Sequence, residues 1–273
     1  MDHKEQTGGR RIVKALVAIF IMAAIGFLGV FISRIYANMQ DKNEYRKQGI
    51  IEYNNEDYEK AAESFQTSLG QQVLLAEPLD RDTRLYLADS LFLSGQYEAA
   101  IQQYDILLET EEEQVGYLIY QRQVAQGFID FQSQNFEEAL PAFQSAIEAG
   151  HNECTLYAGI CAVQLGRKEE IVAYLTTYLS YDPGNAYACT QLADYYLQEG
   201  LYDTCYQYLQ QGLSSTDRSC DTQLLFVEVV YYEYKKDYNK AYELICSYME
   251  TYPVTETVQR EYDFLVTRQT LEN

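Results

Sequence analysis

The segment QYEAAIQQY at residues 96–104 contains the pattern that decides the fold. An aromatic residue is followed three positions later by a small residue, and a bulky residue comes four positions after that. The same pattern occurs in DYEKAAESF (57–65), NFEEALPAF (135–143), LYDTCYQYL (201–209) and DYNKAYELI (237–245), and more weakly in RKEEIVAYL (167–175). Six copies in one register indicate a repeated structural unit.

The small residue of each copy gives the repeat length. This position is occupied by Ala61, Ala100, Ala139, Ile171, Cys205 and Ala241, where Ile171 of the weak copy replaces the small residue. Successive positions are 39, 39, 32, 34 and 36 residues apart. Twelve positions earlier stands a second residue, small in five of six copies: Gly49, Ala88, Gly127, Gly159, Ala193 and Val229. Paired small residues let two antiparallel helices approach closely, so each copy predicts a helical hairpin. Gly95, Gly166 and Gly200 mark turns inside the hairpins.

This pattern resembles the tetratricopeptide repeat family, whose period is 34 residues. The resemblance implies an all-α fold, a right-handed α-solenoid within residues 37–253. About six hairpins are expected, at residues 41–74, 81–114, 120–153, 154–185, 186–219 and 222–253. The two spacings of 39 residues predict longer loops around 70–81 and 109–114. Residues 254–273 are expected to form a capping helix, because Val258, Tyr262 and Leu265 share one helical face.

An uncharged apolar run, ALVAIFIMAAIGFLGVFI, occupies residues 15–32. As a helix it is about 27 Å long, close to the thickness of a bilayer's hydrocarbon core. It predicts a transmembrane anchor at 15–36 after a short basic tail at 1–14. A cleaved signal peptide is the alternative, since the sequence around Ala37 resembles a cleavage site, although the run is long and Arg34 intervenes. The run has no polar face, which argues against a buried soluble helix.

The charges beside the run indicate its orientation. Arg10, Arg11 and Lys14 precede it, whereas Arg34 alone follows it immediately. Basic residues are retained on the cytoplasmic side, so we expect a single-pass cell-membrane protein with a cytoplasmic N-terminus and extracytoplasmic repeats. Neither Gly nor Pro occurs between Gly29 and Gly49. This stretch is compatible with one helix from anchor to first repeat, and a short flexible linker is the alternative that the sequence leaves open.

The acidic balance of the chain limits its partners. It holds 41 acidic and 20 basic residues, a formal net charge of −21, and residues 35–273 alone carry −24. A body of this charge repels phosphate backbones, so we expect no nucleic-acid partner.

No sequence motif indicates an enzyme. The phosphate-binding, dinucleotide-binding and zinc-protease motifs are missing, as is any C-x-x-C pair. The repeats, cap and anchor fill the chain, which leaves no room for a catalytic domain. We therefore expect no catalytic residues, no cofactor and no metal site.

The cysteines allow two interpretations. All six lie in the last three repeats, at Cys154, Cys161, Cys189, Cys205, Cys220 and Cys246. Several fit as small packing residues, but three disulfides with fifteen possible connectivities are also open in an exported domain. Cys220 precedes one helix of the last hairpin and Cys246 comes late in its antiparallel partner. The expected meeting of these two ends makes them the predicted pair.

The resemblance also predicts a binding surface. In this family the first helices of the repeats line a concave groove. The register places eleven residues on or near it: Tyr53, Tyr86, Asp89, Phe92, Phe128, Phe131, Tyr157, Tyr187, Asp194, Phe226 and Tyr234. Aromatic rings interspersed with carboxylates suit protein or peptide partners that carry apolar and basic segments. The alternative is that the acidity only keeps the array soluble.

These observations predict a non-catalytic, membrane-anchored scaffold or adaptor of the cell envelope that binds protein partners through its groove. The alternatives are a sensor of short peptides and a chaperone-like module that holds unfolded chains.

Overall fold

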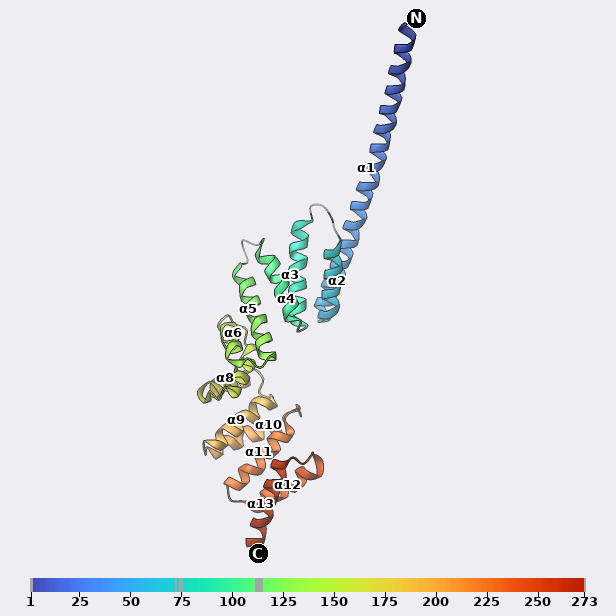
Figure 1. Cartoon of the computed structure of the whole chain (residues 1–273). Coiled ribbons are helices and arrows are strands. Elements are labelled where there is room, and N and C mark those ends of the chain that lie inside the picture. The colour runs from blue at the N-terminus through green and yellow to red at the C-terminus, as the bar shows by residue number, and fades with distance from the viewer. Residues whose placement is uncertain (1, 72, 74–75, 111–114, 273) are drawn as a thin grey trace. The chain divides into compact units, whose positions relative to one another are not determined.

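The structure, a computed structural model, describes residues 2–71, 73, 76–110 and 115–272, and the side chains of residues 20–268 within these ranges. The described residues form helices α1 to α13 and no strand (Figure 1). The prediction of an all-α fold is thus confirmed. The chain divides into two units, unit 1 (Met1–Gln126) and unit 2 (Gly127–Asn273).

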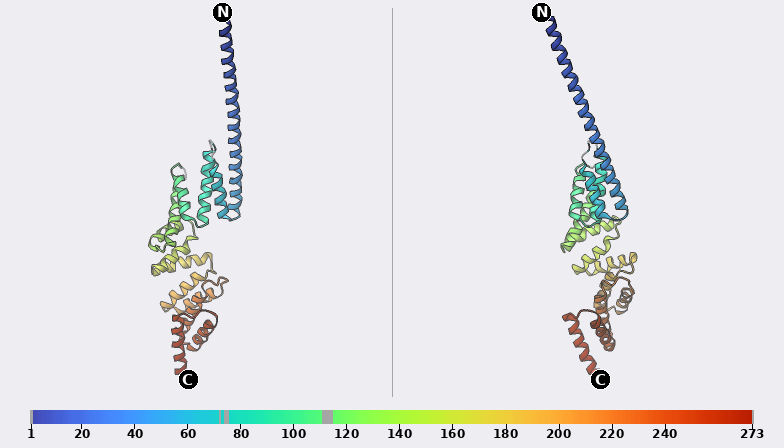
Figure 2. Two further views of the ribbon diagram at one scale, coloured as in Figure 1. Left: turned by 45° about the vertical axis from the view of Figure 1, so that its right-hand side comes forward. Right: turned by 90° about the vertical axis from the view of Figure 1, so that its right-hand side faces the viewer.

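Unit 1 begins with one long helix. α1 (Asp2–Asn54) runs without a break through the predicted tail and anchor into the first hairpin, so the structure has the continuous helix rather than the flexible linker. Its N-terminal part extends beyond the ends of α2 and α3 in both views of Figure 2. The segment Phe20–Asn54 is long and apolar enough to cross a membrane, with a mean hydropathy of 1.9 in its most apolar window, and none of that window is buried.

The other helices of unit 1 complete two hairpins and begin a third. α1 pairs with α2 (Tyr58–Gly70), and α3 (Glu77–Leu93) pairs with α4 (Tyr97–Leu108). α5 (Val115–Gln132) begins here and ends in unit 2.

Unit 2 contains the remaining hairpins. α5 is followed by α6 (Phe136–Glu148), and the next three pairs are α7 (Cys154–Gln164) with α8 (Lys168–Tyr181), α9 (Ala186–Gln198) with α10 (Tyr202–Leu213), and α11 (Asp221–Tyr234) with α12 (Tyr238–Thr251). The last helix, α13 (Glu256–Glu272), packs on α12. Its Val258 and Leu265 are buried against Ile245 and Tyr248 of α12.

The two 39-residue repeat spacings arise from longer first helices. α3 and α5 have 17 and 18 residues, whereas the first helices of the next three hairpins have 11, 13 and 14. The helices α3 and α5 therefore begin earlier than expected, at Glu77 and Val115, and the prediction of longer loops was wrong as an account of the spacing. The earlier start of α3 is compatible with Pro78, which lies in its first turn, where a missing N–H is tolerated. Residues 72, 74–75 and 111–114 of these connections lie outside the described residues.

The small residues have the packing role that the repeat pattern predicts. Ala61, Ala100 and Ala139 are fully buried in their hairpins. A Cβ atom added to Gly49 would lie 2.7 Å from a ring carbon of Phe65, the bulky residue of the same copy. Close approach of the two backbones thus depends on the small side chains.

The hairpin turns share one backbone conformation. The residue two positions before each second helix has a positive φ: Glu56 (62°), Gly95 (77°), Gln134 (61°), Gly166 (66°), Gly200 (71°) and Lys236 (60°). Glycine adopts this left-handed region without steric strain, whereas other residues are less stable in it. Three of the six turns therefore have the favoured residue and three do not.

Candidate functional site

A carboxylate on helix α3 of unit 1 lies among tyrosines from neighbouring helices. Asp89 is on α3, and its Oδ1 accepts hydrogen bonds from the hydroxyl of Tyr104 (3.1 Å) on α4 and, more weakly, from that of Tyr117 (3.5 Å) on α5. Gln121, one turn further along α5, donates to the Tyr117 hydroxyl at 3.0 Å. We call Asp89, Tyr104, Tyr117 and the neighbouring Tyr53 the Asp89 cluster.

Burial sets the protonation of this cluster. It raises the pKa of Asp89, and the hydrogen bonds from Tyr104 and Tyr117 oppose that shift. Burial and the nearby carboxylate raise the pKa of Tyr117 to about 12, and the pKa values of Tyr53 and Tyr104 are raised for the same reasons. The tyrosines therefore stay neutral hydrogen-bond donors, which can hold a carboxylate but cannot neutralise it.

Aromatic contacts fix the rings beside Asp89. The ring of Tyr53 lies edge-on to that of Tyr86, with centroids 5.6 Å apart, and Tyr86 stacks on Phe65 at 5.5 Å. The Arg46 guanidinium lies 6.0 Å from the centroid of Tyr86 and forms an ion pair with Asp82. Tyr53 and Tyr86 are half-buried, so part of each ring stays open to solvent.

Several of the predicted groove residues form aromatic contacts across the turns of their own hairpins. Tyr53 and Phe92 each lie 5.5 Å, edge to face, from the aromatic residue that opens the next helix, Tyr58 and Tyr97 respectively. Phe131 contacts Phe136 at 5.7 Å in the same way. Part of each ring surface is thus used within its own hairpin.

In unit 2 the structure corrects one prediction. Phe128 is only 9% exposed and lies between Phe143 (5.0 Å) and Tyr157 (4.8 Å), so it belongs to the core rather than to an open groove. It is buried because Gly127, beside it, brings α5 close to α6. Phe131 and Tyr157 contact each other at 5.4 Å and are half-buried.

The other predicted residues of unit 2 are dispersed. Burial raises the pKa of Tyr187 to about 12, and Asp194 accepts a hydrogen bond from Gln198 at 2.8 Å. Phe226 packs against the buried residues of the last hairpin and the cap. Tyr234 is 55% exposed, with its ring 5.8 Å from that of Tyr202. The described contacts do not join these four residues into one cluster.

All six cysteines are free thiols in this structure. Cys220 accepts a hydrogen bond from the Ser219 hydroxyl at 3.8 Å, while Cys246 is hydrogen-bonded to Tyr242. The predicted pair is thus not formed here, and a disulfide between Cys220 and Cys246 stays a prediction. Cys205 is fully buried in the small position of its repeat, as the packing interpretation expects.

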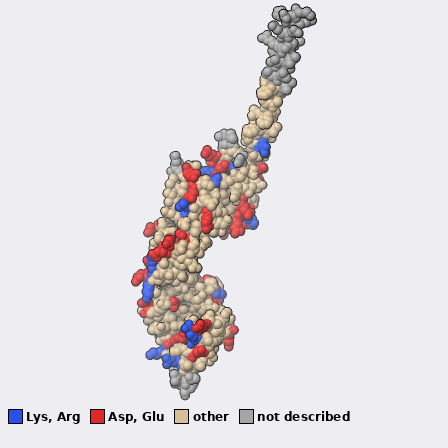
Figure 3. All heavy atoms as spheres, in the orientation of Figure 1, with Lys and Arg blue, Asp and Glu red and all other residues tan. Residues whose placement is uncertain are grey.

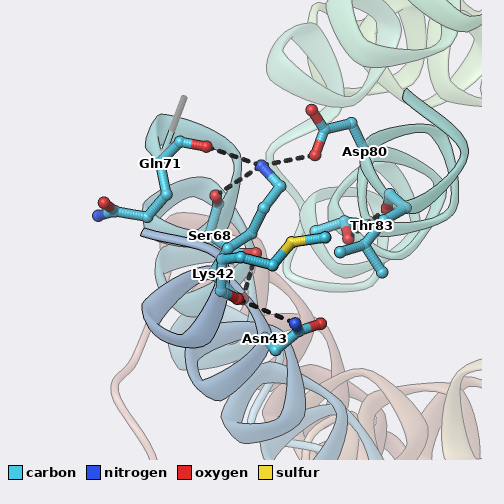
Figure 4. A network of polar contacts seen from close by, with 8 residues as sticks. Lys42, Asn43, Ser68, Gln71, Asp80 and Thr83 are labelled. Atoms are coloured by element: carbon cyan, nitrogen blue, oxygen red, sulfur yellow. Dashed lines mark hydrogen bonds and ion pairs between the residues drawn. The ribbon is translucent and has the colours of Figure 1, made fainter. Parts of the chain in front are cut away.

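A second polar network, which the sequence did not reveal, ties α1 to the hairpins (Figure 4). Lys42 of α1 is fully buried, and its Nζ donates to the backbone carbonyls of Ser68 (3.1 Å) and Gln71 (3.0 Å) at the end of α2. The same Nζ forms an ion pair with Asp80 of α3 at 2.5 Å. The Ser68 hydroxyl returns a hydrogen bond to the Lys42 carbonyl at 2.8 Å.

Charged side chains are unevenly distributed over the surface of the described residues. In Figure 3 groups of charged side chains are distributed over the hairpins in view, whereas the described part of α1 that projects from them is uncharged along most of its length. Among the described residues, no group of three or more His, Cys, Asp or Glu is placed to hold a metal ion.

Sequence reasoning found Asp89 but missed its partners. The repeat pattern identifies Tyr104 only as the bulky residue of its copy, and Tyr117 lies outside this pattern. Helix α5 begins five residues before the predicted start of its repeat, at Val115. The run Tyr117, Tyr120 and Gln121, at helical spacing, was the available signal.

Comparisons with known sequences agree with the repeat pattern. A sequence profile described as tetratricopeptide repeat matches residues 46–112 and 125–186. The TPR repeat-containing protein YpiA of Bacillus subtilis (strain 168) is 25% identical over 128 residues, which are 46% of this chain. The chain matches only 30% of the length of YpiA.

Solved structures show the same fold. PilF of Pseudomonas aeruginosa superposes with a TM-score of 0.55 at 14% identity, over 85% of this chain and 99% of PilF. PilW, a widely conserved type IV pilus biogenesis factor, gives 0.50 at 17% identity, over 81% of this chain and 98% of PilW. At these identities the likeness concerns the fold alone. Together, the repeated hairpins and the matching sequence profile show that this chain contains tetratricopeptide repeats.

Proposed function

We propose that this chain is a membrane-anchored, non-catalytic scaffold of the cell envelope that captures basic segments of partner proteins. Tetratricopeptide repeat arrays act through extended surfaces, which gives the general role in protein interaction. The observation that carries the specific proposal is the Asp89 cluster, a carboxylate held among tyrosine rings on successive helices of unit 1.

The cluster has the chemistry to bind a Lys or Arg side chain. Both tyrosine hydroxyls donate to Oδ1 of Asp89, so an incoming cation would approach Oδ2. The half-buried ring of Tyr53 offers surface for the alkyl stem and for a cation–π contact like the one that Arg46 makes with Tyr86. A charge-assisted hydrogen bond in this partly desolvated position is stronger than one at an open surface.

Apolar residues of the partner would bind beside this cation. Tyr117 is 41% exposed, and Phe92 is half-buried one turn from Asp89 on α3. Tyrosine provides large contact area at low entropic cost, which suits peptide capture. Groove residues of unit 2, Phe131 and Tyr234 among them, are proposed as further contacts.

Helix α1 supports the proposed membrane anchoring. Its exposed apolar segment supports anchoring, and the basic residues before it favour a cytoplasmic N-terminus with extracytoplasmic repeats. The fold likeness to PilW, a type IV pilus biogenesis factor, supports a role in envelope assembly.

The binding proposal is tested by photo-crosslinking in cells that express the full chain. A photoreactive residue in place of Tyr117 should give a protein adduct, whereas the same residue in place of Tyr181, 56% exposed at the end of α8, should not. Asp89→Asn should reduce the yield of the adduct formed by the photoreactive residue at position 117 at least fivefold. Asp203→Asn, the same change at an exposed position on α10, should leave it unchanged.

Each other outcome has a defined meaning. Equal adducts at both positions, or an adduct insensitive to Asp89→Asn, would contradict the Asp89 cluster as the binding site. Adducts with a small peptide would support the sensor, and adducts with many different chains would support the chaperone-like module. Affinity for an identified partner should fall with rising salt, because the contact is charge-assisted.

The orientation needs its own experiment. Protease added to spheroplasts should digest the repeats while the N-terminus stays protected. Repeats that are cut only after lysis would reverse the orientation and assign the partners to the cytoplasm.

A further inference from the structure

A cleft lies where the apolar part of α1 meets the first hairpins. It has a volume of about 550 Å³, within the range of small-molecule sites. α1 contributes four of its lining residues, the end of α2 and the residues after it contribute three, and α3 contributes one: Phe31, Arg34, Ile35, Asn38, Leu69, Gln71, Val73 and Asp80. The cleft belongs entirely to unit 1.

The α1 wall of the cleft follows one face of the helix. Phe31 and Ile35 are one turn apart, as are Arg34 and Asn38, so the four residues form a strip that changes from apolar to polar. This strip is about 10 Å long at 1.5 Å per residue. The polar layer on each side of a bilayer has a similar depth, about 5–8 Å.

The other residues that line the cleft are also partly apolar and partly polar. Leu69 and Val73 are half-buried apolar residues, while Gln71 and Asp80 are polar. The Asp80 side chain is 35% exposed although it is paired with Lys42. Arg34 is exposed at the cleft, so one cation and one accessible carboxylate line the same space.

We propose that this cleft binds one phosphatidylethanolamine molecule from the leaflet in which the apolar segment of α1 ends. The phosphate would bind Arg34 and the ethanolamine ammonium would lie near Asp80, with the start of an acyl chain against Phe31, Ile35 and Val73. The inference rests on the membrane anchoring in the proposed function. It adds a lipid ligand that would join α1 to the end of α2.

The charges that line the cleft, and its continuity with the apolar run of α1, favour phosphatidylethanolamine as the ligand. A zwitterionic head group matches a cleft with one exposed cation and one accessible carboxylate. An anionic lipid would bring its charge toward a body with a net charge of −24, against a like-charged field. The apolar wall of the cleft continues the membrane-spanning run through Phe31, so a lipid can enter sideways from the bilayer.

The test uses the full-length chain in detergent and native mass spectrometry after addition of phosphatidylethanolamine, phosphatidylglycerol or phosphatidylcholine. The protein should retain one phosphatidylethanolamine in preference to the other two lipids. Arg34→Gln removes the phosphate partner, and Val73→Trp fills the cleft without changing its charge. Each should weaken retention at least tenfold, whereas Lys47→Gln, an exposed change on the same helix, should have no effect.

Retention that both Arg34→Gln and Val73→Trp leave unchanged would overturn the cleft as the site. Equal retention of all three lipids would overturn the head-group assignment. Vesicle flotation tests the membrane anchoring independently of lipid retention. All variants should float with vesicles, and a wild-type chain that does not float would contradict the membrane anchoring itself.

Discussion

The ammonium group of Lys42 lies 2.5 Å from the carboxylate of Asp80 and joins α1 to α3. Because the same group donates to the carbonyls of Ser68 and Gln71, it also caps the C-terminal end of α2. Helix ends have unpaired carbonyls and a partial negative charge, both of which favour a cation. This buried lysine thus links α1, α2 and α3 near the point where α1 leaves the hairpins.

Lys42→Met should destabilise unit 1 by about 2–4 kcal/mol, because it leaves Asp80 and two helix-end carbonyls without their cation. Chemical unfolding of the full chain in detergent, followed by circular dichroism, measures the change. Lys47→Met is the matched control, since Lys47 is exposed on the same helix, and it should change stability by less than about 0.5 kcal/mol. Equal effects of the two changes would contradict a structural role for the Lys42 network.

Gly127→Ala should destabilise unit 2 by about 1–3 kcal/mol through overpacking. The added Cβ would lie 2.5 Å from the Cβ of Ala142, which cannot rotate away. Gly116 is on the same helix and has no atom within 4 Å of such a Cβ. Gly116→Ala should therefore be neutral or stabilising, by up to about 1 kcal/mol from helix propensity. Thermal unfolding of both variants compares them, and a neutral Gly127→Ala would refute the close-packing argument.

The repeat pattern could predict the hairpins because small residues leave a signal that depends on spacing alone. Ala61, Ala100 and Ala139 are identified by position and are buried as expected. The lengths of α3 and α5 could not be predicted in this way, because their additional turns lie outside the repeated pattern.

The binding residues were less predictable, since exposure depends on how far a neighbouring helix covers each ring. Phe128 occupies a first-helix position like that of Asp89, yet Phe143 and Tyr157 cover it. Lys42 gave no signal, because a lysine in an acidic sequence is normally an exposed residue. Its burial follows from the approach of three helix segments that are far apart in sequence.

Gln134→Gly should stabilise unit 2 by about 0.5 kcal/mol. Gln134 has a φ of 61° in a hairpin turn, and relief of left-handed strain exceeds the added chain entropy of glycine. The reverse change, Gly166→Ala at a φ of 66°, should destabilise by about 1 kcal/mol. Denaturant midpoints measure both. If Gln134→Gly lowered the midpoint, local contacts of Gln134 would outweigh the backbone strain.

The stability of unit 2 should fall as the pH rises from about 5 to about 8, through Glu233. Burial, followed by the charge of Glu261 and a hydrogen bond with it, raises the pKa of Glu233 to about 8 from its ordinary value of 4.5. The two glutamates are on α11 and α13, so their hydrogen bond links the cap to the last hairpin. The native state keeps a proton that the unfolded chain releases, so this stabilisation is complete below pH 4.5 and is lost as pH approaches 8.

Glu233→Gln should remove this dependence, because an amide stays neutral and can still donate to Glu261. Relative to the wild type, the variant should be more stable by about 1–2 kcal/mol at pH 8.5, after allowance for solvent screening, and nearly equal at pH 5. Glu250→Gln, an exposed change on α12, should show no such pH-dependent difference. Unfolding curves for the three proteins at both pH values give these differences. A Glu233→Gln effect that is the same at pH 5 and pH 8.5 would show that Glu233 does not hold the proton in the folded chain.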